Sequence, residues 1–251
     1  EKTLKESIVH HKAEGSCMDE AWAMIHLAFV YRELESYEKA KKLLQENLKL
    51  YCKTYGEKDY RTGWVMMHLG DVDRLLGNHK KAEALCLDSY SIFEKLYGSH
   101  HIQAAWPLFY LGKIYKDSKR YTQALTALKK TLEIFKNHYG ENHEIIGSLF
   151  HALGETYDLK EDYDLAQIFY EKAIKIHEKD PHPSHYRFFI SLGEFYLKEK
   201  SLQINNISQQ KQREKALAYF KYAYKMVQAS YPKDSILVKK IEKKLKTLLL
   251  T

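Results

Sequence analysis

Histidine is the first residue to test for chemistry in this 251-residue sequence, because imidazole can bind metals and transfer protons. Two histidine pairs are adjacent, His10-His11 and His100-His101, and neighbouring side chains on a helix point about 100° apart. His143 follows Glu141 in a turn, where a structural role is the simpler interpretation. The sequence shows no His-Glu-x-x-His pattern, glycine-rich phosphate loop or nucleophilic serine elbow. We therefore assign no catalytic residue, no metal and no cofactor, and predict that the chain is not an enzyme.

The cysteines, Cys17, Cys52 and Cys86, are odd in number and lack the C-x-x-C spacing of thiolate metal sites. A reducing, cytoplasmic location is the expectation. The sequence has no run of about 18 apolar residues and no signal-like leader, which predicts no membrane insertion. It opens in the middle of a helical pattern, so we expect a fragment of a longer protein.

The tryptophans carry a sharper signal, because Trp22, Trp64 and Trp106 are spaced by 42 residues. Tryptophan and arginine provide large contact areas with a polar group, and they are enriched where proteins bind one another. A constant spacing predicts that the three rings occupy one structural position in successive units. The elements that place them follow from the same period.

The period of 42 recurs at several independent positions, which indicates an internal repeat. A tyrosine followed by glycine recurs at Tyr55-Gly56, Tyr97-Gly98 and Tyr139-Gly140. Leucine followed by a small residue recurs at Leu27-Ala28, Leu69-Gly70, Leu111-Gly112 and Leu153-Gly154, with a fifth copy at Leu192-Gly193. Twelve residues after each of the first four small residues stands an alanine: Ala40, Ala82, Ala124 and Ala166.

Each unit has apolar residues at helical spacing on both sides of a short polar turn, which predicts two helices. With only 11 Gly and 4 Pro and 45% hydrophobic residues, the sequence favours an all-α fold with a continuous core. The small residue and the alanine are expected where the two helices approach most closely. A larger residue sixteen positions after the small one is expected beneath the next unit: Leu44, Cys86, Leu128 and Tyr170.

The pattern Leu111-Gly112-Lys113-Ile114-Tyr115, followed by Tyr121 and Ala124, resembles the tetratricopeptide repeat. The usual period of that family is 34, and the period of 42 resembles the longer variety in kinesin light chains. The resemblance implies an all-α, right-handed α-α superhelix, a solenoid of about five helical hairpins with a C-terminal capping helix. It also implies that the first helix of each hairpin lines a concave groove.

We expect residues 1–14 to end a preceding repeat helix or to form an N-terminal cap. The array spans 15–231, with units near 15–56, 57–98, 99–140, 141–182 and 183–231, and an insertion at 201–212 in the last unit. Pro181 and Pro183 are expected to separate two helices, and Pro107 to bend its helix or mark its start. Residues 232–251 form the capping helix, with Ser235 as N-cap.

Helical geometry places ten aromatic and basic residues on the inner side of the first three units. These predicted partner-binding residues are Trp22, His26, Arg32, Trp64, His68, Arg74, Trp106, Tyr110, Lys113 and Lys116. The fourth unit turns acidic there, with Glu155 and Asp158. An alternative is that the tryptophans only pack between neighbouring first helices as core, and the sequence leaves both interpretations open.

These residues suit a protein or peptide partner with apolar anchors and acidic groups. We therefore expect a protein-interaction scaffold, one module of a larger signalling, transport or effector protein. The asparagines of the family's carboxylate clamp for chaperone tails are not matched, and those of kinesin light chains are replaced by Met66-Met67-His68 and Leu108-Phe109-Tyr110. The ligand is expected to differ.

The alternative function is nucleic-acid binding, which a pI near 9.0 and interleaved aromatics permit. Basic residues number 40 against 33 acidic ones and are spread over nearly every helix. This composition does not require a continuous positive face, so nucleic acid is the less favoured partner.

Overall fold

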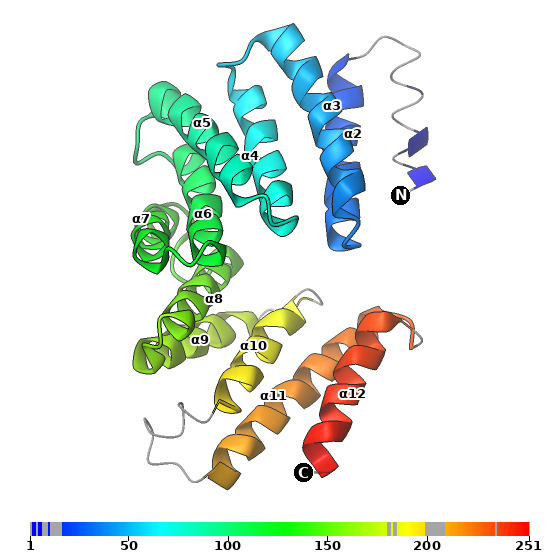
Figure 1. Ribbon diagram of the computed structural model, residues 1–251, viewed down its shortest axis with the longest axis vertical. Helices are drawn as coiled ribbons and strands as arrows, with labels where there is room; N and C mark the ends of the chain where they lie inside the picture. The colour runs from blue at the N-terminus through cyan, green and yellow to red at the C-terminus, as the bar shows by residue number, and fades with distance from the viewer. Residues whose placement is uncertain are drawn as a thin grey trace. The chain divides into compact units, whose positions relative to one another are not determined.

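The computed structural model describes residues 2–3, 5–6, 10, 17–179, 182, 185–198, 209–233 and 235–250. Over these residues the chain forms eleven α-helices, α2 to α12, and no strand (Figure 1). The predicted all-α class is confirmed. None of the helices in these ranges is long and apolar enough to cross a membrane.

The helices form hairpins that follow one another along the chain (Figure 1). The pairs are α2 (Cys17–Glu33) with α3 (Tyr37–Tyr55), α4 (Tyr60–Leu75) with α5 (His79–Tyr97), α6 (Ile102–Asp117) with α7 (Tyr121–Tyr139), α8 (Glu144–Leu159) with α9 (Tyr163–His177), and α10 (Tyr186–Tyr196) with α11 (Gln209–Ser230). A last helix, α12 (Ile236–Leu250), packs on α11. Packing between consecutive helices is that of a solenoid, as the repeat predicts.

The chain divides into two compact units, residues 1–134 and 135–251, with the boundary inside α7. The first unit holds α2 to α6 and most of α7, and therefore all ten predicted partner-binding residues. In this unit the first helices α4 and α6 also contact each other directly.

The small residue of each first helix lies against the second helix of its own hairpin. A Cβ atom at Gly70 would lie 2.6 Å from Cys86 Sγ, and one at Gly112 would lie 2.6 Å from Leu128 Cγ. The expected close approach is confirmed, and Cys86 is a fully buried core residue. The larger residues also contact the next hairpin, as expected: Cys86 packs in one buried cluster with Leu111 and Ile114 of α6, and the ring of Tyr170 lies 5.5 Å from that of Phe195 in α10.

The recurring turn residues have structural roles at the helix ends. The glycines after the second helices have φ angles of 80–90°, a region that strongly favours glycine, at Gly56, Gly98 and Gly140. Three residues later an N-cap side chain accepts a hydrogen bond from a backbone N–H, at Asp59, His101 and His143. The structural interpretation of His143 is therefore confirmed.

The fifth hairpin departs from the others, as the sequence spacing indicates. Helix α10 has 11 residues, whereas α4, α6 and α8 have 16 each. Pro181, Pro183 and residues 201–208 of the expected insertion lie outside the described residues, and the remainder of the insertion is the first turn of α11. Ser235 Oγ accepts a hydrogen bond from the Val238 N–H at 3.2 Å, which confirms the predicted N-cap of the last helix.

Helix α6 begins at Ile102, five residues before Pro107, so the expected helix start near that proline is wrong. His101 supplies the N-cap, and the helix continues through the proline to Asp117. Pro107 removes one backbone N–H from the helix interior. A bend at this position stays a prediction.

Gly112→Ala is expected to destabilise the first unit by about 1–3 kcal/mol, because the new methyl group would overlap the buried Leu128 side chain. Gly63→Ala is the matched control, since its nearest atoms lie at an ordinary 3.4 Å and alanine favours helix by up to about 1 kcal/mol. Urea unfolding followed by tryptophan fluorescence reports on the first unit, which holds all three tryptophans. Equal losses of stability in the two variants would contradict the assigned close contact.

Candidate functional site

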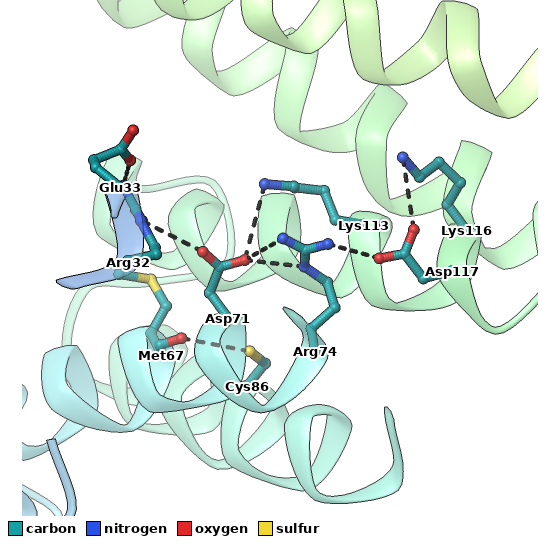
Figure 2. Close-up of polar contacts among 9 residues, drawn as sticks. All are labelled: Arg32, Glu33, Met67, Asp71, Arg74, Cys86, Lys113, Lys116 and Asp117. Carbon is teal, nitrogen blue, oxygen red and sulfur yellow. Dashed lines mark hydrogen bonds and ion pairs between the residues drawn. The ribbon is translucent and has the colours of Figure 1, made fainter. Parts of the chain in front are cut away.

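A cluster of charged side chains from α2, α4 and α6 surrounds Asp71 (Figure 2). The Asp71 side chain is only 3% exposed. Arg74 donates from Nε and Nη2 to its Oδ1 at 2.9 and 2.8 Å, and Arg32 Nη1 donates to Oδ2 at 3.3 Å. Lys113 Nζ lies 3.8 Å from Oδ1. One carboxylate therefore joins cations from three successive first helices.

Arg74 is the most enclosed of these cations. Its Nη1 donates to Asp117 Oδ2 at 2.6 Å, so the guanidinium bridges Asp71 on its own helix to Asp117 at the end of α6. Its side chain is 9% exposed, and Lys116 Nζ lies 3.6 Å from the same Asp117 carboxylate. Arg74 lies on the first helix α4, and its charge links two hairpins.

Arg32 and Lys113 lie at the rim of the cluster. Each side chain is 27% exposed. Arg32 also contacts the exposed Glu33 carboxylate at 3.0 Å. Lys113 Nζ lies 5.5 and 5.6 Å from the ring centres of Phe109 and Tyr110, so the ammonium group lies over aromatic rings.

The electrostatics show a cluster with too little negative charge. Burial alone would raise the pKa of Asp71, but Lys113, Arg74 and Arg32 together hold that pKa well below its usual value. Burial lowers the pKa of Lys113 to about 8, and the neighbouring cations Arg74, Lys116 and Arg32 add to the shift. The single carboxylate of Asp71 does not compensate for them.

Trp64 and Trp106 lie between the neighbouring first helices α4 and α6. Trp64 stacks on His68 with ring centres 5.5 Å apart, meets Phe93 edge-on at 6.1 Å and lies 6.5 Å from Trp106. Trp64 and Trp106 are half-buried, whereas His68 and Tyr110 are buried beneath them. For Trp64 and Trp106 the two interpretations are compatible, because each side chain is partly packed and partly exposed.

His26 and Lys116 are also partly buried, and both lie on the first helices where the sequence predicts them. Trp22 lies in α2, but its side chain is outside the described part of the structure. Burial lowers the pKa of His68 to about 4, with Arg32 adding to the effect, so this imidazole is neutral at pH 7. His68 therefore supports the aromatic surface and adds no charge to it.

Sequence reasoning placed Asp71 on the inner side but missed its role as the shared partner of three cations, and it missed Asp117. A signal was present, since Asp71 and Lys113 occupy the same repeat position and carry opposite charges. The basic residues, although spread over nearly every helix, are densest at the C-terminal end. Residues 209–251 hold eleven Lys and Arg against three Asp and Glu, so the net charge of +7 is no argument about this cluster.

In the part of the chain that the structure describes, no group of three or more His, Cys, Asp or Glu could hold a metal ion. The chemistry of the cluster is that of ion pairing and aromatic contact.

Asp71→Asn is expected to destabilise the first unit by about 3–5 kcal/mol, because it leaves Arg32, Arg74 and Lys113 close together without their shared carboxylate. Asp88→Asn, on the exposed side of α5, is the matched control and should change stability by less than about 0.5 kcal/mol. Urea unfolding by tryptophan fluorescence measures both. A loss no larger than that of the control would mean that the cluster does not hold the three helices together.

Comparison with solved structures finds the same fold in several proteins. BtubC (BKLC) from P. vanneervenii is 19% identical over 93% of this chain and 92% of that chain, with a TM-score of 0.67. A putative kinesin light chain of Podosopora anserina with TPR-like repeats is 19% identical over 78% of this chain and 93% of that chain, with a TM-score of 0.61. A Rap protein complexed with competence and sporulation factor is 14% identical over 92% of this chain and 65% of that chain, with a TM-score of 0.68.

At these identities the similarity to solved structures establishes only the fold of this chain. Proteins with kinesin-light-chain-like repeats share that fold. No curated protein matches the sequence. The sequence profile of the tetratricopeptide repeat matches residues 19–85, 66–137 and 110–179, which together cover more than half of the chain. The chain therefore belongs to the tetratricopeptide repeat family, whose repeats generally act as protein-interaction scaffolds without catalytic activity.

Proposed function

We propose that the first unit binds a peptide or partner helix that carries a carboxylate next to an apolar or aromatic anchor. The binding surface, called here the first-helix surface, consists of the partly exposed side chains of the first helices. Its members are His26, Phe29, Arg32, Trp64, Trp106, Lys113 and Lys116. The observation that carries the proposal is the excess of positive charge above the buried Asp71.

The charge excess favours an incoming carboxylate at Lys113. Three cations, Arg32, Arg74 and Lys113, share the buried carboxylate of Asp71, and Arg74 already bridges from it to Asp117. At Arg32 a ligand would compete with Glu33. At Lys113 the nearest carboxylate oxygen is 3.8 Å away, beyond hydrogen-bond distance, so a ligand carboxylate gains a direct charge-assisted hydrogen bond there.

The apolar anchor would lie on Trp64 and Trp106. The Trp64 ring packs on His68 and Phe93, and the Trp106 ring lies 6.5 Å from that of Trp64. A rigid aromatic surface loses little conformational entropy when a partner binds, which is why such residues dominate binding hot spots. The Rap protein of similar fold was solved with competence and sporulation factor bound, which supports the idea that this type of array can hold a ligand.

On this proposal the chain is a binding module of a larger signalling, transport or effector protein. The free thiols of Cys52 and Cys86 support a reducing compartment such as the cytoplasm.

Selection of random peptides on the purified chain tests the proposal. Recovered peptides should carry Asp, Glu or a terminal carboxylate within a few residues of an aromatic or large apolar residue. Trp64→Ala should weaken their binding by roughly thirtyfold, equivalent to about 2 kcal/mol, and Lys113→Gln by about tenfold. Lys80→Gln, on an exposed position of α5, is the control and should bind as the unchanged chain does.

Thermal unfolding separates lost binding from lost folding, because Trp64 also packs on its neighbours. Peptides that bind Lys113→Gln and the unchanged chain equally well would place the ligand elsewhere. Strong binding of single-stranded RNA with a steep salt dependence would instead favour the nucleic-acid alternative.

A pH series tests the role of Lys113 directly. Because its pKa is about 8, the amine is mostly charged at pH 7 and loses its charge as the pH rises through 8. Affinity for an acidic peptide should therefore be nearly constant below pH 7 and fall above pH 8. Lys113→Arg, which stays charged throughout, should remove this decline. A decline of the same size in Lys113→Arg would show that another group causes it.

A further inference from the structure

His177, in the second unit, occupies a repeat position that holds an aromatic ring in the three preceding hairpins. The preceding members of this series, spaced by 42 residues, are Tyr51, Phe93 and Phe135. His177 is 1% exposed, and a Cβ atom at Gly147 of α8 would lie 2.5 Å from its Nε2. In the first unit Gly63 faces Phe93 in the same way, at 3.4 Å. The imidazole therefore packs where the repeat has a phenyl ring.

The polar atoms of this ring are poorly satisfied. Nδ1 and Nε2 of His177 are both buried and, among the described residues, neither has a hydrogen-bond partner of good geometry, although the backbone of Gly147 lies close enough to favour the charged ring. A buried polar atom without a good hydrogen bond is unfavourable. A phenyl ring would avoid that cost, so histidine at this position weakens the contact between α9 and its neighbours.

The helices packed against His177 bring further titratable groups to it. At the start of α10, the ring of His185 lies 4.1 Å from that of His177, and Phe188 stacks on His177 at 4.2 Å. His182 lies 5.5 Å from His185, and His151 of α8 lies 4.7 Å from Phe188. We call His151, His177, His182 and His185 the histidine cluster.

The carboxylates near the histidine cluster lie at its edge. Glu144 of α8 is 3.8 Å from His185 Nε2, and Glu155 is 3.8 Å from His151 Nδ1. Glu144 is largely exposed. No ion pair to His177 itself is found within the described ranges. Within the described residues, a proton on His177 would therefore be buried against other imidazoles without a carboxylate partner.

We propose that the histidine cluster is an acid-sensitive latch, in which protonation releases α10 from the α8–α9 hairpin. When the rings are neutral they pack as aromatic surfaces. When His177 and His185 are both charged, two buried cations have ring centres 4.1 Å apart, and their repulsion favours separation of the helices that carry them. Helix α10 is the shortest first helix and contacts both α8 and α9, so it is the element that opens.

The titration of His177 agrees with this geometry. Burial lowers its pKa from 6.5 to about 3, His185 and His151 add to the shift, and the backbone of Gly147 opposes it. In the open form the ring returns to its ordinary range near 6.5. The open form thus binds more protons, so the stability of the latch is constant above about pH 7 and is lost as the pH falls from 6.5 towards 3. Between pH 7.5 and pH 5 the opening constant should rise about thirtyfold.

Hydrogen exchange measured by mass spectrometry on the full chain tests the latch. After correction for intrinsic rates, amides in residues 186–196 should open about thirtyfold more at pH 5 than at pH 7.5. Amides of α4, in the first unit, should not show this rise. No extra opening of α10 at pH 5 in the unchanged chain would overturn the proposal.

Substitution with the residue that the repeat itself uses gives the sharper comparison. His177→Phe should remove the acid-dependent opening of α10, because the phenyl ring fills the site without titrating. His177→Leu provides a second non-titrating side chain if the phenyl ring does not fit. His138→Gln, an exposed histidine of α7, should keep the full rise. An unchanged rise in both non-titrating variants would show that His177 is not the group responsible.

Discussion

The close contact between the two helices of each hairpin is the constraint on which the rest of the structure depends. At Gly70, Gly112, Gly154 and Gly193 the backbone of the first helix lies so near the second helix that even a Cβ atom would meet a neighbouring side chain. This contact fixes the rotation of the first helix about its own axis. With the rotation fixed, residues 42 positions apart in the sequence, such as Trp64 and Trp106, come to equivalent positions in successive hairpins.

The residue at each equivalent position then determines which side chain a hairpin adds to the charged cluster. One position carries Phe29, Asp71 and Lys113, and the next carries Arg32, Arg74 and Lys116. Because successive first helices lie side by side, the repeat brings the one carboxylate of Asp71 within reach of cations from three helices. The same ion pairs hold the hairpins together and leave Lys113 at the rim with its charge incompletely balanced, so stability and the proposed binding depend on one cluster.

The repeat explains how much could be predicted from the sequence. The period of 42 with its small residues predicted the hairpins, their order and the contact at Gly112, because close packing admits few residue types. It also placed the ten residues of the predicted site on the first helices. The period could not predict how the charges balance. Arg74 pairs within the protein because Asp117 of the next hairpin lies beside it, and the spacing does not reveal that contact. Nor could the period identify His177 as buried and unpaired, because its neighbours His185 and Phe188 belong to the hairpin where the spacing changes.

The pKa of Lys113 provides the most direct test of the proposed role of the first-helix surface. Selective labelling of lysine side chains with ¹³C permits an NMR titration of the Lys113 Cε resonance, with Lys113→Arg identifying the signal. The account predicts a pKa near 8 in the free chain and a higher value once an acidic peptide is bound, because the ligand carboxylate stabilises the charged amine. A pKa in the ordinary range near 10.5 in the free chain, or no change on adding the peptide, would contradict it.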